Sequence, residues 1–184
     1  MSTTRSLILR TVYGRAWNSR LLVMGGVVTV DEARRRFLEG GKEDWFSVGA
    51  YADGVPDGAA PEYTMEVTPQ GGFISVSFYD QLCRVRFEFL FGKTDAGVMF
   101  LEEIYDFRYP DESTYYTRSG SVLTTNYRYR PDGSMHWYRD DAVKGVIEEA
   151  DYRDIDVSTH WEPVPEFGEW ASITRFDRTK PVGA

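Results

Sequence analysis

The sequence is poor in the residues that form covalent cross-links and metal sites. It has one cysteine, Cys83, and two histidines, His136 and His160. A single thiol excludes an intramolecular disulfide and a cysteine-based zinc centre. It is also typical of proteins in a reducing compartment, so we expect a cytoplasmic protein.

Long apolar runs and cofactor motifs are missing as well. Residues 7–9 are too few for the apolar core of a secretion signal, and Arg10 follows them directly. No run approaches the roughly 20 apolar residues of a membrane-spanning helix, so we expect no membrane contact. The glycine pairs lack the lysine and the spacing of phosphate-binding loops, and we expect no cofactor.

Positive charge is scarce, and negative charge is concentrated in one segment. The chain has 29 acidic and 21 basic residues, which gives a net charge of −8. Residues 148–169 hold eight carboxylates and one arginine. An acidic protein repels nucleic acid, so we expect no nucleic-acid partner. The acidic segment suits a protein partner with a basic surface, and a solvated face that aids solubility is the alternative.

Aromatic residues and short alternating segments are abundant. Aromatic residues make up 15% of the 184 residues, which favours β-sheet, and the length fits a single domain over 1–184. From residue 62 to 177 the apolar pattern has a period of two, which is typical of strands. The predicted strands are 62–67, 72–79, 82–91, 97–109, 121–130, 134–140, 152–161 and 170–177. The Pro-Asp-Gly sequence at 131–133 predicts a hairpin turn.

The N-terminal part, residues 1–45, is predicted to be helical. Thr29 is a suitable N-cap for a helix over 30–39, and a glycine pair follows that helix. Residues 6–24 remain ambiguous, because apolar residues recur every four positions while Gly14 disfavours a helix. The apolar positions concerned are Leu9, Tyr13, Trp17 and Leu21. Residues 51–61 are rich in Pro, Gly and Asp and predict a loop.

Short connections between strands predict antiparallel pairing in a meander. We therefore expect a mainly β fold, with α+β as the other possibility. Its sheet would be curved or closed into a small barrel, with one or two N-terminal helices packed against it. In the strand at 82–91, one face should be buried and carries Val85, Phe87 and Phe89. The other face, with Arg84 and Arg86, should meet solvent or a polar lumen.

Two adjacent carboxylates are the candidate catalytic residues. Glu102 and Glu103 lie in the strand at 97–109, which is apolar on both faces. Neighbours on a strand point to opposite sides, so one of the two should face the interior. Such a carboxylate either forms a structural ion pair, with Arg84, Arg86 or Arg128 of a neighbouring strand, or its pKa rises and suits general acid–base chemistry.

Other strand residues suggest a ligand pocket or a metal site. The candidate lining residues of a pocket are Tyr63, Tyr105, Tyr127, Tyr129 and Trp137, and ordinary core packing is the alternative. If their strands were adjacent, His136 and His160 could join Asp154 and Asp156 in a metal site. Neither an HxH nor an HxxxH spacing occurs, so a surface pair is favoured and we expect no metal.

The segment 160–170 combines two tryptophans, a phenylalanine and two prolines with several acidic residues. Its rings, Trp161, Phe167 and Trp170, are candidate anchors for a protein partner, together with Asp154 and Asp156. The alternative is an aromatic plug that covers one end of the sheet.

A small, acidic, aromatic-rich β protein resembles both toxin-immunity proteins and lipocalin-like barrels. The first resemblance implies a non-enzymatic protein that binds a basic protein partner and neutralises or regulates it. The second implies a lipocalin-like barrel or a nuclear-transport-factor-like cone. Such a protein would bind or cyclise a small apolar ligand without a cofactor, through Glu102 or Glu103. The choice between enzyme and binding protein stays open at this point, as does the oligomeric state.

Overall fold

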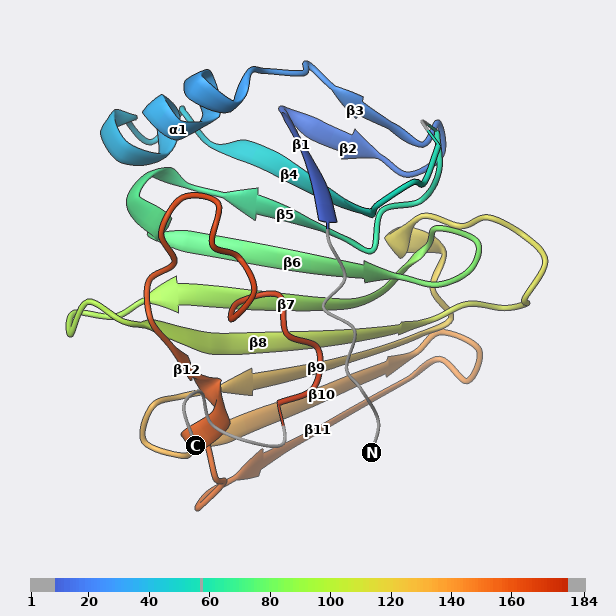
Figure 1. Cartoon of the computed structure of the whole chain (residues 1–184). Coiled ribbons are helices and arrows are strands. Elements are labelled where there is room, and N and C mark those ends of the chain that lie inside the picture. The colour runs from blue at the N-terminus through green and yellow to red at the C-terminus, as the bar shows by residue number, and fades with distance from the viewer. Residues whose placement is uncertain (1–8, 57, 179–184) are drawn as a thin grey trace, which may run out of the picture.

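The computed structural model describes residues 9–56 and 58–178. Within them, an antiparallel sheet of ten strands dominates the fold (Figure 1). In spatial order the main strands are β1 (Leu9–Gly14), β4 (Phe46–Ala52), β5 (Tyr63–Val67), β6 (Phe73–Tyr79), β7 (Val85–Lys93), β8 (Met99–Arg108), β9 (Leu123–Tyr129), β10 (Met135–Asp141) and β11 (Val146–Tyr152). The short β12 (Trp161–Glu162) pairs with β8. The mainly β prediction is confirmed, and the barrel alternative is wrong because β1 and β11 do not pair with each other.

The helix α1 (Val30–Glu39) begins where the sequence predicts. The Glu32 amide donates a hydrogen bond to the Thr29 hydroxyl at 3.2 Å, and Gly40 follows the last turn. Ala33 and Phe37 on the inner face of the helix belong to the hydrophobic core. The predicted helix over 30–39 is therefore confirmed and packs against the sheet.

The residues before α1 form strands and not a second helix. β1 pairs with β4, which places Tyr13 opposite Val48 in the core. β2 (Ala16–Asn18) and β3 (Val23–Gly25) form a separate small sheet. A Cβ at Gly14 would collide with the Met24 side chain, so this glycine allows the close approach of that sheet. Residues 9–24, which the sequence left ambiguous, therefore contain strands, and the helical prediction for 1–45 holds only for α1 among the described residues; residues 1–8 lie outside them.

The C-terminal third also differs from the predicted strands. β11 ends at Tyr152, and an irregular stretch leads to a 3-10 turn, η3 (Ser158–His160). Residues 170–177 form turns, in which the Thr174 amide donates to the Trp170 carbonyl at 3.0 Å. The strands predicted at 152–161 and 170–177 are therefore wrong. In the second of these segments, Trp170 and Ile173 pack into the core instead of belonging to a strand that pairs with the sheet.

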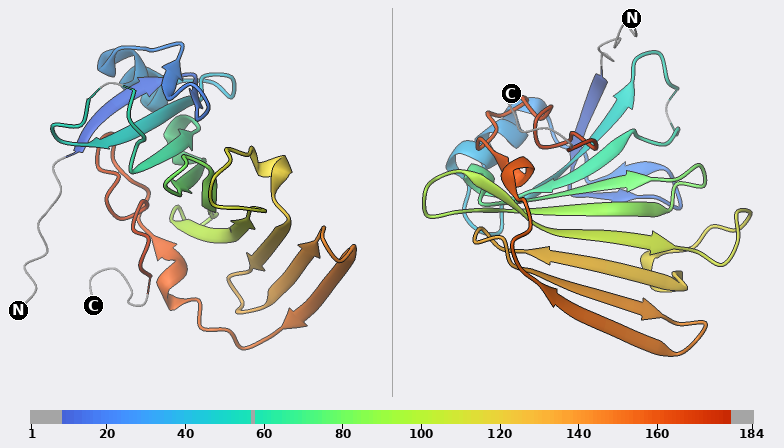
Figure 2. Two further views of the ribbon diagram at one scale, coloured as in Figure 1. Left: turned by 90° about the vertical axis from the view of Figure 1, so that its right-hand side faces the viewer. Right: turned by 90° about the horizontal axis from the view of Figure 1, so that it is seen from below.

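One face of the sheet, the core face, carries the hydrophobic core. Its buried strand residues are Tyr13, Phe46, Val48, Ala50, Tyr63, Met65, Val67, Ile74, Val76, Phe89, Phe91, Met99 and Leu101. The C-terminal segment, residues 163–178, crosses in front of this face as the red ribbon in Figure 1. In the left view of Figure 2 this segment lies on one side of the sheet, and the chain around η2 (Arg118–Gly120) lies on the other.

The buried face predicted for β7 is largely as observed. Val85 and Phe89 are buried, and the partly buried Phe87 packs against the core. The expectation for Arg84 is wrong, because this arginine precedes the strand and is only 3% exposed. Its guanidinium pairs with the Asp80 carboxylate at 2.6 Å and also donates to two backbone carbonyls of the segment that follows β8. Burial of this arginine is possible because its donors are satisfied.

Candidate functional site

The second face of the sheet, the polar face, carries rows of polar side chains that cross the strands. Opposite residues of an antiparallel pair lie on the same face, so the register defines each row. One row consists of Thr64, Ser77, Glu88, Tyr105, Asn126, Tyr138 and Glu149. The next consists of Glu66, Ser75, Leu90, Glu103, Arg128, His136 and Asp151. Ionisable residues far apart in the sequence therefore meet on this face.

A bulge in β8 decides where the two candidate catalytic carboxylates lie. The register places Leu90 opposite Glu103 but Phe91 opposite Leu101, so Glu102 is the additional residue. Glu103 lies on the polar face with Leu90. Gly92 is two residues after Leu90 in β7, so a Cβ at Gly92 would point to the polar face. Such a Cβ would collide with the Glu102 carboxylate, so Glu102 lies on the polar face too. The prediction that one of the two faces the interior is wrong, since the bulge interrupts the alternation on which it rested.

Glu103 is held by three hydrogen-bond donors. It accepts from Arg128 Nε at 3.0 Å, from the Tyr105 hydroxyl at 2.7 Å and from Asn126 Nδ2 at 3.1 Å. Burial, together with the hydrogen bond to this carboxylate, raises the pKa of Tyr105 to about 12, so the hydroxyl stays a donor. This is the geometry of a structural ion pair that joins β8 to β9.

Glu102 differs from its neighbour because it is exposed. Partial burial and the nearby Glu103 charge raise its pKa. A more enclosed carboxylate is Glu88, which is 8% exposed and whose pKa is raised by burial. Glu88 pairs with Arg118 at 2.9 Å. Sequence reasoning missed Glu88 as a candidate, although its place between Phe87 and Phe89 was the available signal.

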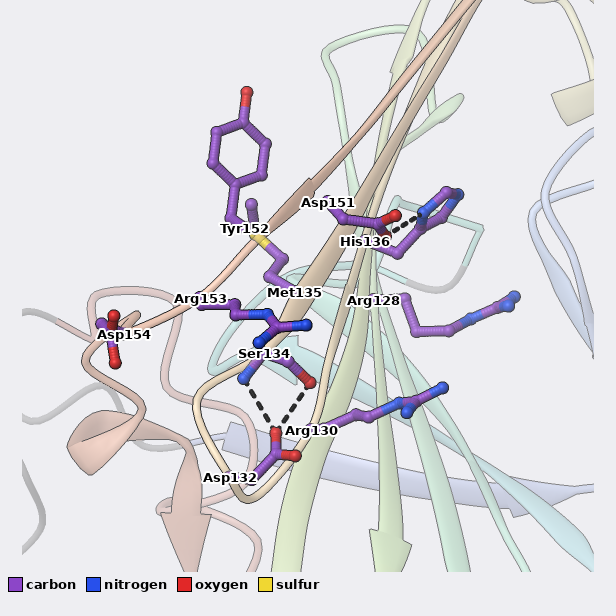
Figure 3. A pocket seen from close by; sticks show the side chains of 10 residues that line it. All are labelled: Arg128, Arg130, Asp132, Ser134, Met135, His136, Asp151, Tyr152, Arg153 and Asp154. Carbon is purple, nitrogen blue, oxygen red and sulfur yellow. Dashed lines mark hydrogen bonds and ion pairs between the residues drawn. The ribbon is translucent and has the colours of Figure 1, made fainter.

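A groove of about 790 Å³ opens at the end of the β9, β10 and β11 strands. Figure 3 shows Arg128, Arg130 and His136 extending to the same side of these strands, with Arg153 between the strand ends. The groove also contains Asp132, Asp151 and Asp154. Charges of both signs are mixed here, which suits a polar surface contact better than a closed apolar ligand site.

The two histidines lie in different surroundings. His136 Nδ1 lies 2.9 Å from an Asp151 carboxylate oxygen on the polar face. His160 is buried, and its Nδ1 lies 3.1 Å from the Leu101 carbonyl oxygen. They do not share a face, so the metal arrangement with Asp154 and Asp156 is not formed. Within residues 9–56 and 58–178, no group of three or more His, Cys, Asp or Glu side chains could hold a metal ion.

The five candidate lining residues of a ligand pocket do not converge. Tyr63 is buried in the core beside Phe78, at a ring distance of 6.5 Å. Tyr105 lies on the polar face. The remaining three, Tyr127, Tyr129 and Trp137, are half-buried on the opposite face of β9 and β10.

The candidate anchor rings of segment 160–170 are mostly enclosed. Trp170 is 3% exposed, and Phe167 packs against it at a ring distance of 5.8 Å. Trp161 is half-buried against Phe100 at 4.7 Å. Glu162, counted with the acidic segment, is buried and paired with Arg178 at 2.5 Å. Rings that are enclosed in this way are less available as anchors for a partner, as in the alternative of an aromatic plug on the sheet.

The remaining carboxylates of the acidic segment are accessible. We call five of them the acidic edge: Glu148, Glu149, Asp151, Asp154 and Asp156. All five are exposed, and they follow one border of the sheet along β11 and the stretch after it. Sequence reasoning placed the strand too late in the chain, because β11 is exposed on nearly all sides and shows no buried alternation.

Comparisons with known proteins identify no relative. No protein-family model, no curated protein and no solved structure matches the chain. Among the residues that the structure describes, α1 is too short and too polar to cross a bilayer. A functional assignment therefore rests on the side chains of this protein alone.

Proposed function

We propose that this protein is a non-enzymatic binding protein that neutralises or regulates a protein partner with a basic surface, as immunity proteins do. Its contact region is the acidic edge. The observation that carries the proposal is the concentration of exposed carboxylates on the last strand of an open sheet. A local excess of exposed negative charge accelerates association with a partner of opposite charge and orients it.

The ligand-binding alternative has less support. A pocket for a small apolar ligand normally encloses most of the ligand and is lined mainly by apolar side chains. The candidate lining residues are divided between the two faces of the sheet: Tyr105 lies on the polar face and the other four lie on the core face. Glu103 is engaged by Arg128 and by two further donors, so it is not a free acid–base group beside the Tyr105 ring.

The test compares association rates of charge variants. A basic protein captured by the intact chain is purified, and its binding is measured over a range of ionic strength. Asp154→Lys combined with Asp156→Lys should slow association about tenfold at low salt, and the difference should shrink as salt rises. The matched control, Glu166→Lys combined with Glu169→Lys, makes the same charge change on the C-terminal segment and should keep the wild-type rate. Equal rates for all three proteins would contradict the proposal.

A further inference from the structure

The outer border of β11 presents backbone groups that are available for pairing. This strand has seven residues and pairs with β10 from Val146 to Tyr152 without a register shift. It is the last strand of the sheet, and among the described residues no strand lies on its other side. In an antiparallel edge strand, alternate N–H and C=O groups point outward.

β11 lacks most of the devices that protect edge strands. Proline, lysine, a bulge or a very short length normally block the addition of another strand. The strand Val-Ile-Glu-Glu-Ala-Asp-Tyr contains neither proline nor lysine and has a regular register. The other end of the sheet differs, because the Val28 amide donates to the Tyr13 carbonyl of β1 at 3.0 Å and so covers part of that edge.

Exposed apolar side chains accompany this border. Ile147 is 62% exposed, and Val146 and Tyr152 are each 45% exposed. Val143, in the turn that precedes the strand, is 76% exposed. An added strand would cover part of this surface and would gain cross-strand side-chain contacts along with backbone hydrogen bonds.

We propose that β11 accepts an additional β-strand, supplied by an extended, lysine- or arginine-rich segment of the partner protein. This inference rests on the proposed function, because it specifies how the acidic edge holds that partner. Glu149 and Asp151 lie on the polar face, so basic residues two positions apart in the added strand would lie opposite them. Glu148 lies on the other face between Val146 and Ala150, so the residues that alternate with the basic ones in the added strand would be apolar or carry hydroxyls.

Charge also selects against the other obvious occupant, a second copy of this chain. Pairing of two β11 strands would bring the carboxylates of one copy beside those of the other. Like charges that face each other across strands are destabilising. The side chains concerned stay well solvated, since Glu149 is 68% and Asp151 87% exposed, so a basic strand can approach without burying an unpaired charge.

The test uses the intact chain and a defined peptide, acetyl-Lys-Thr-Lys-Val-Lys-Thr-Lys-amide. Binding is followed by titration at low salt, and backbone contact by amide hydrogen exchange. We expect exchange at alternate residues of β11 to slow about tenfold on peptide binding, while exchange in β1 is unchanged. Glu149→Lys combined with Asp151→Lys should weaken binding about tenfold. Two controls separate the effect of the β11 carboxylates from that of net charge. One is the protein with Glu166→Lys and Glu169→Lys, and the other is a peptide with glutamate in place of lysine.

Three results would overturn strand addition. Peptide binding without slower exchange in β11 would mean that side-chain attraction alone holds the peptide. Absence of binding at low salt would remove the edge as a docking site. Concentration-dependent protection of β11 without peptide would make a second copy the occupant. The proposed function fails separately, when association with the purified partner is insensitive to charge reversal at Asp154 and Asp156.

Discussion

At the scale of single residues, His160 shows how tertiary contacts change a titratable group. Its ring is buried between the aromatic ring of Tyr129, at 4.3 Å, and that of Phe100, at 5.7 Å. Burial lowers the pKa of His160 below its ordinary value of 6.5, and the Arg178 charge acts in the same direction. The hydrogen bond with the Leu101 carbonyl and the charge of Asp156 act in the opposite direction but do not outweigh burial.

This environment predicts a pH dependence of stability. Because the pKa is lower in the folded protein, the unfolded chain binds more protons as the pH falls below about 6.5, and stability decreases. His160→Gln removes this titration. The free energy of unfolding of the variant should therefore vary less than that of the wild type between about pH 7 and about pH 5. Urea denaturation over that range measures the slope, with His136→Gln as the solvent-exposed control. An unchanged slope in the His160 variant would contradict the interpretation.

At the scale of elements, the bulge in β8 reconciles an apolar strand with two adjacent carboxylates. Before it, Met99 and Leu101 face the core; beyond it, Glu103 and Tyr105 face the other way. One additional residue thus keeps both glutamates on the polar face and leaves the core apolar. Without it, strict alternation would put a carboxylate into the core, at the cost of burying its charge.

The same elements predict unequal consequences of core truncation in β7. Phe91 is fully buried, so Phe91→Ala should lower the free energy of unfolding by about 3–5 kcal/mol. Phe87 is only partly buried, and Phe87→Ala should cost less, about 1–3 kcal/mol. Denaturant unfolding of the two variants measures the difference. Equal losses, or a larger loss at Phe87, would contradict the deeper burial of Phe91 on the core face of this strand.

At the scale of the whole molecule, the C-terminal segment closes the core face. Glu162 lies in β12, and its carboxylate forms ion pairs with Arg175 at 3.2 Å and with Arg178 at 2.5 Å. The Arg178 guanidinium also lies over the Phe91 ring, 4.8 Å from its centroid. Charged and apolar contacts therefore hold this segment across strands that are distant from it in sequence.

Removal of the Glu162 carboxylate should weaken the packing of the C-terminal segment on the core face. Glu162→Ala removes the counter-ion of the buried Arg178 and one partner of Arg175, and it should destabilise the fold by about 3–5 kcal/mol. The matched control is Glu166→Ala, an exposed carboxylate on the same segment, which should change stability by less than about 0.5 kcal/mol. Thermal or urea unfolding measures both. Similar values for the two variants would show that the ion pairs contribute little.

Local pattern alone was sufficient for the helix α1 and for the strands from β5 to β10. In these segments the cap, the turn residues and the period of two reflect a backbone that is buried on one side only. β4 was missed because it is buried almost throughout and shows no alternation. β11 was misplaced for the converse reason, since almost none of it is buried.

The sequence by itself determined the fold class, the helix and most strand positions, because each depends on residues close together in the chain. Only the tertiary structure decided which polar groups meet. It turned Glu102 and Glu103 to one face, paired Glu103 with Arg128, and enclosed Trp170 in the core. Register, bulges and the path of the C-terminal segment set those contacts, and they depend on long-range packing that no local pattern encodes.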